Sequence, residues 1–223
     1  MSRLSEVSVE GLAPVYSSPS LSSLYNRFFK RVLDVFLVLL AAPFVLPLVL
    51  LMGLLIRRDG GSAFYTQDRI GLDGRVFRIY KLRTMVVDAD AKLAAHLAAD
   101  PELRAEWEET QKLKTDPRIT AAGRLLRKTS LDELPQLWNV VKGDMSLVGP
   151  RPMLPEQRAL YPGRAYYKMR PGLTGPWQVS DRNTVSFAGR ADFDAAYARE
   201  MSLARDLTLM FLTVWVVVRG TGY

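Results

Sequence analysis

The hydrophobic pattern of the chain is dominated by one apolar run at residues 32–56. It holds 25 residues and one charge, Asp34. At 1.5 Å per residue, a straight helix of this length would reach roughly 37 Å, enough to cross the hydrocarbon core of a bilayer. Arginines follow the run instead of a small-residue cleavage site, so the pattern predicts a membrane segment and not a cleaved signal peptide.

Two prolines, Pro43 and Pro47, lie in the middle of this run. Each lacks a backbone donor and clashes with the preceding helical turn, and a break there leaves halves of about 11 and 9 residues, each too short to span a bilayer. Basic residues flank both ends, as on the cytoplasmic side of membrane segments (Lys30, Arg31, Arg57 and Arg58). The pattern favours a re-entrant helix–break–helix. A kinked transmembrane helix and a buried soluble helix remain the alternatives.

The polar and apolar positions after this run predict a smaller set of mixed elements. In residues 63–81, two β-favouring runs flank Gly-Leu-Asp-Gly, which is a hairpin signal. Residues 86–114 read as one or two helices, interrupted at Asp100-Pro101, where Asp suits the cap and Pro the first helical position.

The C-terminal half alternates helical stretches with irregular ones. A short basic turn or helix is expected at 123–128, a helix at 130–142 and another at 187–201, while the Gly- and Pro-rich residues 143–182 predict few regular elements. Residues 207–218 form a second apolar run, too short to span and typical of a core or interfacial segment. The expected fold is α+β and mainly helical: a flexible tail at 1–24, a re-entrant membrane helix at 25–58, and a membrane-associated catalytic domain with a small hairpin and interfacial amphipathic helices at 59–223.

Composition adds that the partners are anionic. The net charge is +7 and the pI about 9.7. Residues 86–110 hold seven acidic and two basic residues, so this segment is −5 and the remainder is +12. A basic remainder suits anionic lipid or phosphorylated substrates. No nucleic-acid-binding motif is present and aromatic residues do not alternate with basic ones, so nucleic acid is not expected as a partner.

The reactive residue types are few. The chain has no cysteine and one histidine, His96. Disulfides and thiolate metal sites are therefore excluded, and a histidine base is nearly excluded. Carboxylates must perform any acid–base chemistry.

The most suggestive carboxylates are adjacent, Asp132 and Glu133. Ser130-x-x-Glu133 fits a capping box, and acidic residues suit the first turn of a helix, which is the commoner origin of such a pattern. A helix start also suits phosphate, and Arg127 and Arg151 could supply guanidinium forks for a pyrophosphate. A carboxylate at such a site is either a magnesium ligand or a nucleophile toward phosphorus.

Four blocks together resemble the monotopic phosphoglycosyl transferases, bacterial sugar transferases that start the assembly of exopolysaccharide, O-antigen or glycoprotein glycans. The resemblance covers about residues 28–220 and looks closest to the branch that transfers galactose-1-phosphate to undecaprenyl phosphate. The chain looks like the catalytic unit without the four-helix N-terminal extension of larger members. The blocks are KRVLDVFLVLLAAPFVLPLVLL, FYTQDRIGLDGRVFRIYKLRTM, DPRITAAGRLLRKTSLDELPQLWNVVKGDMSLVGPRP and RPGLTGPWQVSDRN.

The resemblance implies a two-step reaction. Asp132 would attack the β-phosphate of a UDP-sugar, UMP would leave, and a polyprenyl phosphate would then take the phosphosugar from the aspartyl intermediate. Glu133 would position groups or help to deprotonate the lipid phosphate, and Mg²⁺ would lie near Asp132. The implied substrate-binding residues are Arg127, Arg151, Lys81, Arg83 and Arg182.

The same resemblance implies the surroundings of the enzyme. The partners would be a UDP-sugar, undecaprenyl phosphate and inner-membrane lipid, with a homodimer as a possible assembly. The location would be the bacterial inner membrane, with the catalytic domain on its cytoplasmic face. Two other functions remain open: an inactive membrane-anchored interaction protein, and a membrane-surface phosphohydrolase with the same nucleophile.

Overall fold

The computed structural model describes residues 24–110, 113, 115–180 and 186–218, so residues 1–23 of the expected tail lie outside the described part. Within these ranges the chain is mainly helical and carries two small two-stranded sheets. The expected class, mainly helical with a small hairpin, is confirmed.

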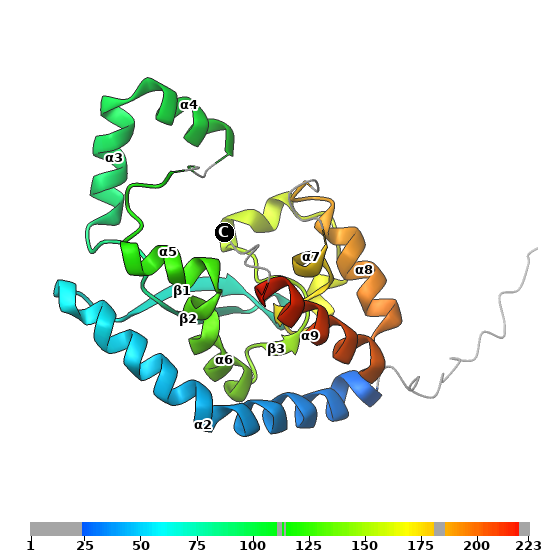
Figure 1. Ribbon diagram of the computed structural model, residues 1–223. Helices are drawn as coiled ribbons and strands as arrows, with labels where there is room; N and C mark the ends of the chain where they lie inside the picture. Colours follow the sequence, from blue (N-terminus) through cyan, green and yellow to red (C-terminus); the bar gives the residue numbers. More distant parts are fainter. Residues whose placement is uncertain (1–23, 111–112, 114, 181–185, 219–223) are drawn as a thin grey trace, which may run out of the picture.

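A long helix, α2 (Lys30–Ile56), follows a π-helical turn at Tyr25–Phe29 and runs as a bent arc along one side of the molecule (Figure 1). Pro43 and Pro47 lie inside this one helix. The expected division into two helices at these prolines is therefore wrong. Each proline removes one internal hydrogen bond, which bends a helix, but the intact turns on either side continue it.

One side of α2 packs on the rest of the molecule, and the side chains of the other side are exposed. Val38, Val49 and Ile56 are buried against residues of the hairpin and of two later helices. Among the described residues, α2 is the one helix long and apolar enough to cross a membrane. Eight large apolar side chains on it are at least 53% exposed: Phe36, Leu39, Leu40, Phe44, Leu46, Leu50, Leu51 and Leu54.

The predicted hairpin is confirmed. Strands β1 (Phe64–Ile70) and β2 (Val76–Leu82) are antiparallel, with the first residue of β1 opposite the last residue of β2. The turn contains Asp73 and Gly74 with positive φ of 57° and 74°, the conformation that Asp and Gly tolerate best. Ile79 of β2 is 2% exposed and packs against Val38 of α2 and Val140 of α6. The hairpin therefore contacts both the long helix and a later one.

Helices α3 (Ala89–Ala99) and α4 (Pro101–Thr110) project from the body of the molecule (Figure 1). Asp100 separates them, as predicted. Its Oδ1 accepts the backbone N–H of Glu102 at 2.9 Å and of Leu103 at 3.2 Å. The carboxylate thus caps α4, whose first residue is the proline.

The centre of the chain builds a compact region beside the hairpin. As expected, its Gly- and Pro-rich part forms only short elements. In order these elements are α5 (Ala121–Lys128), a 3₁₀ segment (Leu131–Gln136), α6 (Leu137–Lys142), β3 (Ser146–Val148), two 3₁₀ turns (Pro155–Leu160 and Tyr166–Lys168), β4 (Gly172–Thr174) and α7 (Pro176–Val179). Strands β3 and β4 pair in parallel.

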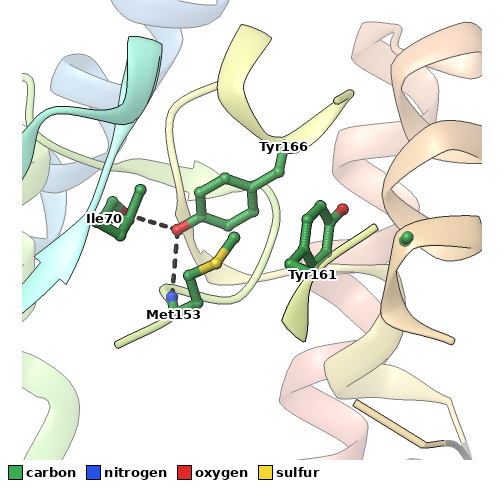
Figure 2. Packing of buried hydrophobic residues seen from close by; sticks show 5 residues of the cluster. Ile70, Met153, Tyr161 and Tyr166 are labelled. Carbon is green, nitrogen blue, oxygen red and sulfur yellow. Dashed lines mark hydrogen bonds between the residues drawn. The ribbon is translucent and has the colours of Figure 1, made fainter. Parts of the chain in front are cut away.

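A tyrosine joins this region to the hairpin. The Tyr166 hydroxyl donates to the carbonyl of Ile70 at 2.5 Å and accepts the N–H of Met153 at 3.2 Å (Figure 2). All three belong to one buried cluster with Tyr161. The end of β1 is therefore fixed against the Gly- and Pro-rich segment.

Two C-terminal helices, α8 (Arg190–Glu200) and α9 (Leu203–Val218), complete the fold. Asp206 of α9 is 1% exposed; it pairs with Lys30 and accepts hydrogen bonds from the hydroxyls of Tyr25 and Tyr197. The N-terminal end of α2 is thereby attached to α9 through a buried ion pair.

Candidate active site

The adjacent acids lie in the 3₁₀ segment between α5 and α6. Ser130, which precedes this segment, has φ 55° and makes no side-chain cap. The expected capping box is therefore wrong, because an N-cap side chain needs an extended backbone and Ser130 is left-handed. The N–H of Glu133 instead donates to the carbonyl of Ser130 at 3.2 Å, which leaves the Glu133 side chain available for a distant partner.

That partner is Lys81 of β2. Its Nζ lies 2.7 Å from Oε1 of Glu133, and both side chains are about one-fifth exposed. Asp132 beside them is 8% exposed. The structure therefore brings three of the predicted site residues together from two segments about fifty residues apart in sequence.

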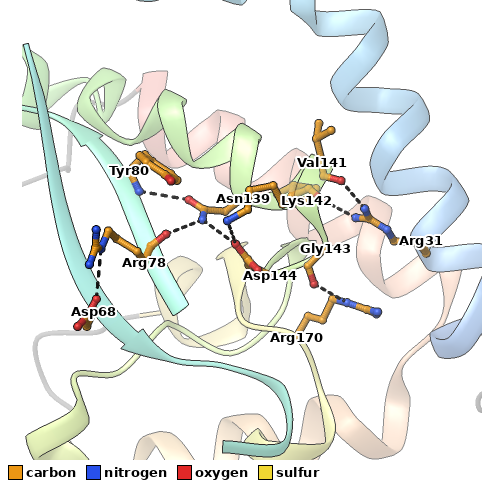
Figure 3. Close-up of polar contacts among 11 residues, drawn as sticks. Arg31, Asp68, Arg78, Tyr80, Asn139, Val141, Lys142, Gly143, Asp144 and Arg170 are labelled. Carbon is orange, nitrogen blue, oxygen red and sulfur yellow. Dashed lines mark hydrogen bonds and ion pairs between the residues drawn. The ribbon is translucent and has the colours of Figure 1, made fainter. Parts of the chain in front are cut away.

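Asn139 holds the acidic segment over β2. This fully buried side chain accepts the N–H of Tyr80 at 3.2 Å and donates to the carbonyl of Arg78 at 2.7 Å and to Asp144 at 3.2 Å (Figure 3). It lies in α6, directly after the 3₁₀ segment. Because Tyr80 immediately precedes Lys81, these bonds set the position of the acids relative to the lysine.

The two carboxyl groups have opposite pKa shifts. Burial raises the pKa of Asp132 to about 6, with Lys81 opposing the shift and the charge of Glu133 adding to it. Burial also raises the pKa of Glu133, but the charges of Lys81 and then Arg151 outweigh it and hold that pKa below its ordinary value. Such a divergence assigns different chemical tasks to two neighbouring acids.

Arg127 and Arg151 each act on one of the two acids, Arg127 on Asp132 and Arg151 on Glu133. The Nε of Arg127 donates to Oγ1 of Thr84 at 2.9 Å, and its charge lowers the pKa of Asp132. Helix α5 comes close to this point at Gly123, where a Cβ would lie 2.0 Å from the carbonyl oxygen of Thr84. Arg151 lies with its guanidinium carbon 5.8 Å from the ring centre of Trp177.

The other two predicted substrate-binding residues are placed differently. The guanidinium of Arg83 donates to the backbone carbonyls of Ser62 at 2.6 Å, Met85 at 3.2 Å and Ile56 at 3.3 Å. It thus ties the end of α2 to the hairpin, and a contact with substrate stays a prediction. Arg182 lies outside the described residues.

Two further arginines, Arg69 and Arg190, lie in the same region, although neither was among the residues predicted from the sequence. Burial and then the charge of Arg151 lower the pKa of Arg69, and the same two causes lower that of Arg190 to about 10. The charges of Arg151 and Arg69 both act on Glu133, so these two guanidiniums form a natural site for a multiply charged anion beside the acids. Arg69 lies in the second block of the resemblance and could have been proposed from it, whereas Arg190 lies outside all four blocks.

The donor set also suits a divalent cation. Among the described residues, no three His, Asp or Glu side chains come together. Mg²⁺ commonly binds through one or two carboxylates, completed by phosphate oxygens and water. Asp132, raised in pKa but ionised at neutral pH, can supply one such carboxylate, so the residues fit the ion that the resemblance implies.

Comparisons with known proteins bear on the whole chain. A family model described as bacterial sugar transferase matches residues 25–220. The undecaprenyl-phosphate galactose phosphotransferase of Salmonella typhimurium is 47% identical over 199 residues, which are 88% of this chain and 42% of that protein. The UDP-galactose-lipid carrier transferase of Erwinia amylovora is 46% identical over 92% of this chain and 43% of its own length.

Shorter relatives match over most of their length. The exopolysaccharide production protein ExoY of Rhizobium meliloti is 45% identical over 196 residues, 86% of this chain and 87% of that protein. The chain thus spans less than half of the two longer relatives and nearly all of the shorter one.

Proposed function

Since the chain belongs to the bacterial sugar transferase family, we propose that it moves a sugar-1-phosphate from a UDP-sugar to undecaprenyl phosphate and releases UMP. The donor is UDP-galactose or UDP-glucose, in keeping with the names of the relatives. The observation that carries the proposal is the buried Asp132, which lies beside a Lys81–Glu133 pair and an arginine cluster. The product would begin an exopolysaccharide or another surface glycan.

In the first step, a carboxylate oxygen of Asp132 attacks the β-phosphorus of the donor. A P–O bond forms to Asp132, and the bond from that phosphorus to the bridging oxygen breaks, so UMP leaves with the electron pair. Phosphate esters repel an anionic nucleophile, and the nearby guanidiniums of Arg69 and Arg151 offset that repulsion. A raised pKa makes the Asp132 carboxylate more basic than an ordinary aspartate and still ionised at pH 7.

In the second step, a phosphate oxygen of the lipid attacks the same phosphorus and displaces the Asp132 carboxylate. Glu133 is better suited to holding Lys81 in place than to taking a proton, because its lowered pKa makes it a weak base. Mg²⁺, held by Asp132, would neutralise phosphate charge in this site.

We propose that the enzyme works at the inner membrane, with α2 re-entrant and the domain on the cytoplasmic face. The bare apolar side of α2 supports insertion into lipid. Both ends of the helix contact the same domain: Lys30 pairs with Asp206, and the carbonyl of Ile56 accepts from Arg83. A helix attached at both ends to one domain favours entry and exit on one face.

The test is to incubate purified protein with UDP-galactose or UDP-glucose and Mg²⁺, and to measure UMP. UMP release that requires undecaprenyl phosphate supports transfer. Steady release without the lipid would instead show a phosphohydrolase, and no release with any UDP-sugar would leave a membrane-anchored interaction protein.

A further inference from the structure

A small hollow lies beside Arg151, and apart from Arg151 its lining residues have no part in the reaction above. We name it the Trp177 hollow. Its main lining residues come from the Gly- and Pro-rich segment and from the start of α8: Arg151, Tyr161, Trp177, Phe187, Arg190 and Asp194. Arg151 lines the hollow, and Arg69 donates to the carbonyl of the next residue, Pro152, at 3.3 Å, so the hollow adjoins the two arginines proposed to bind phosphate.

The hollow contains hydrogen-bond donors without a partner. The guanidinium carbon of Arg190 lies 4.0 Å from the ring centre of Trp177 and 4.7 Å from that of Phe187. The Nε of Arg190 and the indole nitrogen of Trp177 are both buried, and neither has a hydrogen-bond partner within the described part of the chain. Buried donors left unpaired are costly, so the pair points to oxygen acceptors supplied by a ligand.

The hollow also contains a buried acceptor. Asp194 is 4% exposed, and its Oδ2 accepts the hydroxyl of Tyr161 at 2.6 Å. A carboxylate has about four acceptor positions, so it retains capacity for a ligand donor. The donors of Arg190 and Trp177 and the acceptor of Asp194 thus line one hollow together with aromatic rings.

We propose that the Trp177 hollow receives a hydroxyl-bearing edge of the hexose of the donor. The assignment rests on the proposed function, in which the hexose is attached to the phosphate that Asp132 attacks. A hydroxyl both donates and accepts, so it satisfies Asp194 and the unpaired N–H groups at once. Uracil suits the hollow less, because it stacks best on open rings and Arg190 already stacks on Trp177 and Phe187.

The experiment compares Asp194→Asn with Asp192→Asn, an exposed residue of the same helix. For UDP-galactose and UDP-glucose, Asp194→Asn should raise KM roughly tenfold to a hundredfold, the usual effect of losing a hydrogen bond to a charged group. The inhibition constant of UMP, which has no hexose, should stay unchanged. Asp192→Asn should alter neither quantity.

Two outcomes would overturn the proposal: a KM that matches the control, or UMP inhibition weakened as much as donor binding, which would place the nucleotide in the hollow. If Asp194→Asn does not fold, Arg190→Lys carries the test, because it keeps the charge but loses the planar stack. It should raise the donor KM without changing UMP inhibition. Failure of wild type to release UMP from any UDP-sugar would contradict the proposed function itself, which is a separate result.

Discussion

At the scale of single residues, the site depends on how two adjacent carboxyl groups are made unequal. Asp132 and Glu133 share one 3₁₀ turn, yet only Glu133 contacts Lys81 directly. The pKa of Asp132 is therefore set mainly by burial, and that of Glu133 mainly by neighbouring cations that overcome burial. A buried carboxylate that is ionised at pH 7 is reactive and also destabilises the fold.

Asp132→Asn should abolish turnover and yet stabilise the protein. No phosphosugar adduct should form, which intact-mass analysis after incubation with donor alone can check. The variant should also melt at a higher temperature at pH 7, because a pKa raised to about 6 means that ionised Asp132 costs up to roughly 3 kcal/mol.

This stability difference has a defined pH dependence. Folding favours protonated Asp132, so the cost is full above about pH 6, falls steadily below that pH and vanishes below about pH 4, where aspartate becomes protonated in both states. Asp192→Asn, an exposed control, should shift the melting temperature little. A retained adduct in Asp132→Asn would refute Asp132 as the nucleophile.

The pH profile of the activity should have an acid limb near the pKa of Asp132. The value of kcat/KM for the donor should fall below about pH 6, as the nucleophile becomes protonated. Glu133→Gln should move this limb to lower pH, since it removes a negative charge that raises the pKa of Asp132 and frees Lys81 to lower it further. A limb that stays in place or moves to higher pH would contradict this coupling.

At the scale of elements, the sequence correctly predicted the features that are set by local turn and cap residues. The hairpin at Gly-Leu-Asp-Gly and the Asp100-Pro101 junction are both present, because turn and cap chemistry act within a few residues. The two misjudged features depended on more than local sequence. The prolines of α2 bend the helix without ending it, and Ser130 is left-handed and makes no cap.

The left-handed Ser130 is itself testable as the residue that starts the acidic segment. Ser130→Gly should keep activity, because glycine adopts φ near 55° without steric cost. Ser130→Val should lower the melting temperature and the activity together, since a β-branched residue is strongly disfavoured there. The melting curve and the rate of UMP release measure both effects; a fully active Ser130→Val would show that this backbone conformation is dispensable.

At the scale of the whole molecule, the site could be only half predicted. Asp132, Glu133 and Lys81 belong to recognisable motifs, and the structure brings them into one place. Arg190 and Asp194 have ordinary sequence surroundings, and they reach Arg151 because α8 packs against the Gly- and Pro-rich segment. Long-range packing of this kind leaves no periodic signal along the chain.

The attachment of both ends of α2 to one domain leads to a prediction about topology. The chain has no cysteine, so Leu24→Cys and Ser62→Cys each introduce a single thiol, one before and one after the helix. Both should be shielded from an external membrane-impermeant thiol reagent in intact cells and labelled after lysis. A helix that crosses the membrane would place the two thiols on opposite faces, and labelling of only one in intact cells would show this.

Such a crossing would require the buried Lys30–Asp206 pair to come apart, because Asp206 belongs to the same domain as the hairpin that follows α2. Breaking a buried ion pair by separating its partners costs several kcal/mol, which is why we expect the re-entrant arrangement.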